Sequence, residues 1–168
     1  YASVLGMSFD RALLEALLEG EDAAFERYPW PRLAQFVDDE GAGSYRFRHA
    51  LMRDAAYEGL PYRRRRELHA RVGRALLASA SDKQHEHAEL LSLHFFLAGD
   101  LERAWRYSTI AAERAKAAYA NMEASRFFRR AIDAGRRIPD VSDAEIATLQ
   151  ESLGDALNLA GEYKKAGD

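Results

Sequence analysis

The chain has 168 residues, of which 48% are apolar and 30% are charged, and its formal net charge is −3. It contains no cysteine, which excludes disulfides and cysteine-ligated zinc. No segment approaches the roughly 20 apolar residues of a transmembrane helix, and no signal peptide opens the chain, so we expect a cytoplasmic protein with no membrane partner. Ala, Leu, Glu and Arg dominate while Gly and Pro are scarce, which predicts a mainly α-helical fold.

Residues 1–60 have the pattern of a small domain of two helices and one strand. The leucines between residues 13 and 18 have helical spacing after a possible cap at Ser8 or Asp10, and Gly20 ends that helix. A second helix is predicted to begin at Pro31 and to carry Leu33, Phe36 and Val37. The glycines at 41 and 43 predict a turn into the strand. This order of elements is typical of a winged-helix or helix-turn-helix variant.

The predicted strand, residues 44–48, alternates aromatic residues with arginines. From Ala50 the spacing becomes helical, with Leu51, Ala55 and Ala56 on one stripe. His49 is therefore expected at the junction, where the free N–H groups of a helix N-terminus and an imidazole can together bind a phosphate. The alternative is that His49 only caps the helix or packs at the junction.

Arginines are concentrated between residues 46 and 74, a segment that contains nine arginines and only three acidic residues. The preceding segment, residues 10–40, is acidic, and blocks of opposite charge usually pair within a fold or across an interface. A helix is predicted from Pro61 or Tyr62 to about Ala80, with an inner stripe of Leu68, Val72, Ala75 and Leu76. Arginines 63–66 then form either a charged surface or a contact with an acidic partner, and His69 is a partly buried helix residue.

Residues 84–168 contain a degenerate repeat. The spacing of a tetratricopeptide helix pair occurs at Leu91, Ser92, Phe95, Gly99, Asp100 and Ala104. It recurs at Leu153, Gly154, Leu157, Gly161, Glu162 and Ala166, and a weaker copy lies between them. Small residues on the helix after Gly99 predict close packing of antiparallel helices, and Ser142 with Glu145 predicts a capping box. The histidines at 85, 87 and 94 have no metal-ligand spacing, so no metal site is expected.

Residues 47–51 and 53–57 resemble the end of the winged-helix domain of STAND-type regulatory ATPases. This group includes large bacterial transcriptional activators and proteins with adenylate or guanylate cyclase domains. Residues 2–9 are similar to the first segment of that domain. The resemblance implies a partial winged-helix-like domain at residues 1–60 and a tetratricopeptide-like α-solenoid at residues 61–168, truncated at the C-terminus, from a larger protein.

The resemblance also assigns a role to His49. In the NB-ARC members the matching histidine contacts the β-phosphate of bound ADP, so His49 is expected to sense the nucleotide of the parent protein. Ala50 stands where those members have aspartate, so the paired carboxylate is absent. The chain itself is expected to bind no cofactor, since it has no phosphate-binding loop, and the missing ATPase domain is an expected partner.

The expected function is a non-catalytic protein-interaction and regulatory module that binds a protein or peptide on its helical repeats. The sequence contains no Ser-His-Asp, paired-carboxylate or metal pattern, so an enzyme is not expected. The alternative is a DNA-binding transcription regulator that uses the winged-helix unit and the arginine-rich patch. DNA is not expected as a partner, because the helix that would read it, residues 32–40, ends in three consecutive acids.

Overall fold

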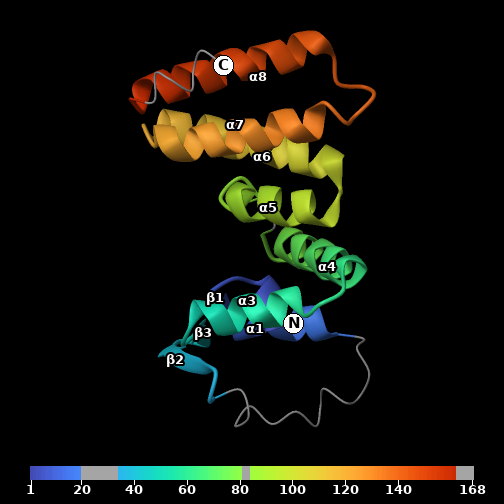
Figure 1. The fold of residues 1–168 in the computed structure, drawn as a ribbon, viewed down its shortest axis with the longest axis vertical. Helices are drawn as coiled ribbons and strands as arrows, with labels where there is room; N and C mark the ends of the chain where they lie inside the picture. The colour runs from blue at the N-terminus through green and yellow to red at the C-terminus, as the bar shows by residue number, and fades with distance from the viewer. Residues whose placement is uncertain (20–33, 81–83, 162–168) are drawn as a thin grey trace. The chain divides into compact units, whose positions relative to one another are not determined.

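The computed structural model describes residues 1–19, 34–80 and 84–161. The protein is mainly helical and contains a small three-stranded antiparallel sheet, which confirms the predicted fold class at this coarse level (Figure 1). The chain divides into two compact units, Tyr1–Leu76 and Leu77–Asp168. The sequence grouped residues 61–76 with the helical repeats, whereas in the structure they belong to the first unit.

The first unit is built around its sheet. It begins with a short 3-10 helix η1 (Ala2–Val4), strand β1 (Ser8–Asp10) and helix α1 (Arg11–Leu18), followed by β2 (Val37–Gly41) and β3 (Ser44–Phe47). The strand order is β1-β3-β2, so the strand predicted from the sequence lies in the middle. Phe9 and Phe47 are buried with their ring centroids 5.6 Å apart, and Val37 lies opposite Phe47 in register. These three side chains form the apolar face of the sheet.

The helix predicted from Pro31 is wrong over its described part, because residues 34–36 form a turn and Val37–Gly41 forms β2. Its acidic residues favour a strand poorly by themselves, and the pairing with β3 decides the conformation. Asp38 pairs with Arg48 at 2.9 Å and Glu40 with Arg46 at 2.7 Å. The DNA-reading helix expected at residues 32–40 is therefore wrong over its acidic end, while residues 31–33 lie outside the described residues.

Two helices complete the first unit. Helix α4 (Tyr62–Ala80) has the predicted bounds, and its predicted stripe is buried at Leu68, Val72 and Leu76. Helix α3 (Ala50–Glu58) differs, since none of its residues is buried. Its apolar stripe faces solvent, with Leu51 82% exposed.

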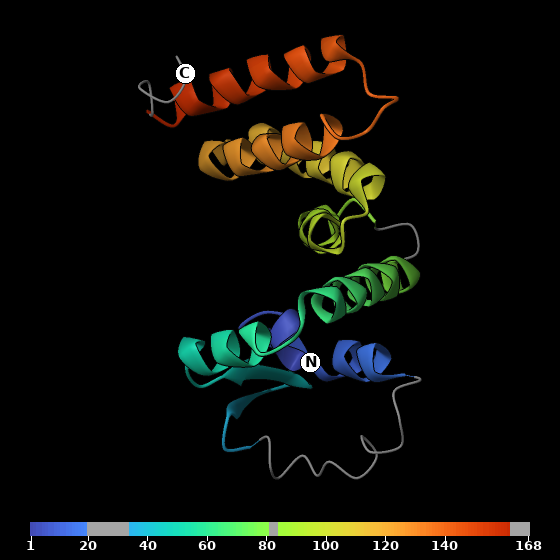
Figure 2. The same ribbon diagram turned by 45° about the vertical axis from the view of Figure 1, so that its right-hand side comes forward.

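The second unit consists of helices α5 (Ala88–Ala98), α6 (Leu101–Ala117), α7 (Asn121–Gly135) and α8 (Asp143–Leu159). Each packs against the next along the chain, and in Figure 2 α5 is seen almost end-on while α7 and α8 lie across the view. The predicted small-residue seam is present on α6, where four alanines are buried: Ala104, Ala111, Ala112 and Ala115.

The helix ends of the second unit follow the sequence signals. Gly99 adopts a φ of +77° at the end of α5, a left-handed conformation that glycine tolerates best. Ser142 and Glu145 form the predicted capping box at the start of α8. Within the described residues, no helix is both long enough and apolar enough to cross a membrane.

Candidate functional site

His49 lies where the sequence placed it, between β3 and α3. It is the N-cap residue of α3, with an extended backbone (φ −138°, ψ 131°), and its side chain is exposed and makes no capping hydrogen bond. The first N–H groups of a helix have no partners within that helix, so an imidazole at this position lies beside donors that an anion can use. The alternative, a histidine that caps the helix or packs at the junction, is not seen, because the side chain makes no capping hydrogen bond and is exposed. The phosphate contact stays a prediction.

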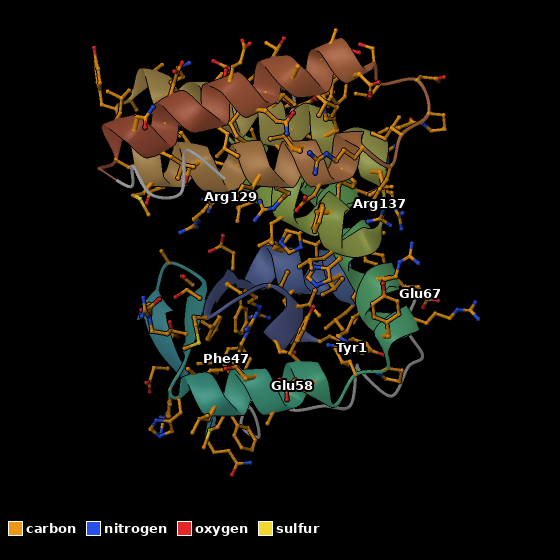
Figure 3. All side chains as sticks on the ribbon, turned by 45° about the horizontal axis from the view of Figure 1, so that its top comes forward. Tyr1, Phe47, Glu58, Glu67, Arg129 and Arg137 are labelled. Carbon is orange, nitrogen blue, oxygen red and sulfur yellow. The ribbon has the colours of Figure 1, made fainter. Side chains whose placement is uncertain are left out.

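The arginine-rich patch of the first unit is largely engaged within that unit. Besides the two ion pairs between the strands, Arg63 and Arg64 both pair with Glu67, at 3.0 and 3.3 Å. Arg64 also donates to the Tyr1 hydroxyl at 2.7 Å and lies over its ring; Figure 3 labels Tyr1 and Glu67. Arg71 donates to the backbone carbonyl of Glu19. The two charge blocks seen in the sequence meet at the ion pairs of Arg46 with Glu40 and of Arg48 with Asp38.

A partly buried polar cluster joins α3 to α4. The Tyr57 hydroxyl and His69 Nε2 are hydrogen bonded at 3.0 Å, and the Tyr57 ring has the guanidinium groups of Arg53 and Arg65 at 5.2 and 5.1 Å from its centroid. Arg53 also donates to the carbonyl of Ser3 at 3.1 Å. Burial, with the charges of Arg53 and Arg65, lowers the pKa of His69 to about 4. His69 is thus a neutral, structural residue at pH 7.

The second unit carries a basic surface on α7. We call it the arginine stripe, and it consists of the five arginines of α7 and the turn after it: Arg126, Arg129, Arg130, Arg136 and Arg137. They share one helix face with Asp133 and Met122, and all but Arg130 are exposed. Among the described residues, no arginine of the stripe makes an ion pair, although Glu123 and Asp133 lie on the same helix. Arg129 and Arg137 project from the same edge of the second unit in Figure 3.

Arg130 connects the arginine stripe to α5. Its Nη1 donates to the hydroxyl of Ser92 at 2.7 Å, and its guanidinium lies 5.8 Å from the ring centroid of Phe127. Burial and the positive charge of Arg126 lower the pKa of Arg130.

Away from Ser92, α5 presents a second exposed surface, which we call the leucine stripe: Leu90, Leu93 and Leu97. These residues are 45%, 36% and 37% exposed and lie on one helix face. The opposite face of α5 is buried, including Leu91 and Phe95. Since a helix that is apolar all round is usually covered on every side, the leucine stripe lacks the cover that its composition predicts.

The sequence analysis did not single out either stripe. The arginines recur at a spacing of three and four residues in the sequence, but this spacing alone does not show whether they pair with the acids of the same helix. Only the structure shows that the acids remain apart from the arginines. Within the described residues, no group of three or more His, Asp or Glu side chains is placed to hold a metal ion.

Comparisons with family models, with curated proteins and with solved structures find no match for this chain.

Proposed function

We propose that this chain is a non-catalytic protein-interaction and regulatory module of a larger signalling protein, and that it binds a partner protein through its second unit. The observation that carries the proposal is the exposed surface of the arginine and leucine stripes. An uncovered apolar helix face is typical of an interaction surface, and so are arginines that pair with no acid among the described residues. A tetratricopeptide-like arrangement of α5–α8 would supply the rigid scaffold for such a surface.

The proposal extends to the first unit as a winged-helix-like regulatory element of a STAND-type ATPase. Its support is the position of His49 at an exposed helix N-terminus, next to a three-stranded antiparallel sheet. In that setting, ADP or ATP bound to the ATPase domain would contact His49, and the nucleotide state would control access of the partner to the second unit.

The experiment compares partner binding by the intact parent protein loaded with ADP and with ATP. We expect His49→Ala to abolish the difference between the two nucleotides, because the substitution removes a phosphate contact of only one state. Leu51→Ala, an exposed change on the same helix, should retain it. An unchanged nucleotide dependence in the His49→Ala protein would rule out the sensing role and leave partner binding to be judged separately.

The DNA-binding alternative has weaker support. Phosphate contacts need cations that are free to leave their present partners, and most arginines of the first-unit patch are paired with acids or stacked on tyrosines. The acidic residues of β2 also lie in the same sheet as Arg46 of β3, and their negative charge opposes the binding of DNA. A gel shift of the chain with duplex DNA at increasing salt tests this alternative, which requires tight binding that falls steeply as salt rises.

A further inference from the structure

Helix α3 turns its polar side toward the first unit and its apolar side outward. Arg53 donates to a backbone carbonyl of η1, and the Tyr57 hydroxyl bonds to α4, so both side chains point into the unit. At about 100° per residue, the apolar residues of the helix fall on the side away from them. We call this side the outer face of α3, and it consists of four exposed residues: Leu51, Met52, Ala55 and Ala56.

This orientation is the reverse of the usual one, because a surface helix normally buries its apolar stripe and exposes its polar side. Leu51 is 82% exposed and Met52 is 39% exposed. A single exposed leucine needs no explanation, but here all the apolar residues of one helix side lie together in solvent while an arginine and a tyrosine occupy the inner side. The outer face of α3 therefore has the character of a contact surface for another polypeptide.

The order of side-chain sizes on the outer face of α3 shows which polypeptide fits it. The two large residues come first, and the two alanines follow about one turn later. A two-fold axis through the middle of this face, with the helices antiparallel, places Met52 of one copy in the same layer as Ala55 of the other. The same axis places Leu51 in the same layer as Ala56, so each large side chain lies beside a small one. In a parallel pair, alanines share a layer with alanines and leave a gap.

The charges at the ends of the helix favour the same arrangement. His49 and Glu58 are exposed at the two ends of α3, and the four residues of the outer face carry no charge. Figure 3 labels Glu58 on this helix. In the antiparallel pair the two Glu58 residues lie about 13.5 Å apart along the helix axis, whereas a parallel pair brings them to the same end. A second copy of this chain thus matches the outer face of α3 in both size and charge.

We propose that two copies of this chain associate through the outer faces of α3 in an antiparallel contact with two-fold symmetry. The contact does not depend on nucleotide sensing or on partner binding by the second unit. Each copy contributes few side chains, so the contact is smaller than that of a permanent dimer, and we expect a dissociation constant on the order of 100 µM.

Sedimentation equilibrium of the full 168-residue chain measures this association. The chain has a mass of 18.9 kDa, and we expect mostly monomer at about 10 µM and mostly dimer at about 1 mM. A chain that stays monomeric at the higher concentration, or that forms larger species without a dimer, would overturn the inference.

Matched variants locate the contact. Met52→Lys and Ala55→Glu each place a charge in the outer face of α3 and should each raise the dissociation constant at least tenfold. Leu97→Lys and Ala147→Glu introduce the same charges at exposed positions of α5 and α8 and should change it less than threefold. Circular dichroism confirms that each variant is folded. Equal effects of the two pairs would refute a contact through α3.

An equimolar mixture of the Met52→Lys and Ala55→Glu chains tests the antiparallel register. In this register the introduced lysine of one chain lies beside the introduced glutamate of the other. The mixture should therefore associate at least threefold more tightly than either variant alone, and the gain should shrink as salt rises. A parallel pair keeps the two positions in different layers and does not provide this contact. A mixture that associates no better than its components would refute the antiparallel arrangement.

Discussion

At the scale of single residues, His69 makes the first unit sensitive to pH. Its pKa is about 4 in the fold, against 6.5 for the unperturbed group, so the unfolded chain takes up the proton at higher pH than the folded one. The stabilisation is complete above pH 6.5 and is lost as the pH falls from about 6.5 to 4. Between pH 7 and 5 we expect the free energy of unfolding to fall by about 2 kcal/mol from this group.

Urea unfolding at both pH values, together with an NMR titration of the His69 ring, measures this effect. His69→Gln removes the titrating group and should reduce the pH dependence by the same amount. If the unfolding free energy of His69→Gln depends on pH as strongly as that of the unsubstituted chain, groups other than His69 cause the pH dependence.

Tyr57→Phe tests the hydrogen bond on the other side of this cluster. The substitution keeps the ring between Arg53 and Arg65 but removes the hydroxyl that bonds to the buried Nε2 of His69. We expect a loss of about 1 kcal/mol in unfolding free energy. Tyr62→Phe is the control, because Tyr62 is 69% exposed and should change little. Equal effects of the two substitutions in urea unfolding would contradict the role given to Tyr57.

At the scale of helices, we expect replacement by alanine to have opposite effects on stability at two glycines of the second unit. A Cβ on Gly135, the last residue of α7, would lie 2.8 Å from Ile146 Cδ1 and 3.0 Å from Trp105 Cδ1. Gly135→Ala should therefore cost about 1–3 kcal/mol through overpacking. A Cβ on Gly154, inside α8, would meet nothing within 4 Å, so Gly154→Ala should stabilise by about 0.5–1 kcal/mol.

Thermal unfolding followed by circular dichroism distinguishes these outcomes, and the fluorescence of Trp105 reports the local change for Gly135→Ala. Equal shifts of the same sign in both variants would contradict the packing of α7 between α6 and α8.

The sequence predicted elements well where local signals were strong. The helix from Tyr62 to Ala80, the strand before His49 and the capping box at Ser142 all have residue patterns that specify them without distant partners. The strand at Val37–Gly41 was missed because its acids favour a strand only once the arginines of β3 lie opposite. The arginine stripe was missed for a related reason, since spacing alone does not show whether nearby charges meet.

At the scale of the whole molecule, the two units use their arginines differently. Arg53 in the first unit bonds to Asp54 and Ser3 and lies over Tyr57, so Arg53→Gln should destabilise the protein by about 1–2 kcal/mol. Arg126 in the second unit pairs with no acid among the described residues and lies near the cation of Arg130. Arg126→Gln should leave stability within about 0.5 kcal/mol or raise it slightly.

Denaturant midpoints of both variants check this contrast. A marked loss of stability in Arg126→Gln would mean that the arginine stripe serves the fold itself and would weaken the case for a partner.

The absence of buried side chains on α3 has a consequence for the local stability of this helix. A helix without apolar anchors can detach while the hydrophobic core stays closed, so its local opening costs far less than global unfolding. Amide hydrogen exchange should accordingly be faster in α3 than in α6, whose alanines are buried. Detachment of α3 would also break the hydrogen bond between Tyr57 and His69, so it would expose the buried ring of His69 on α4.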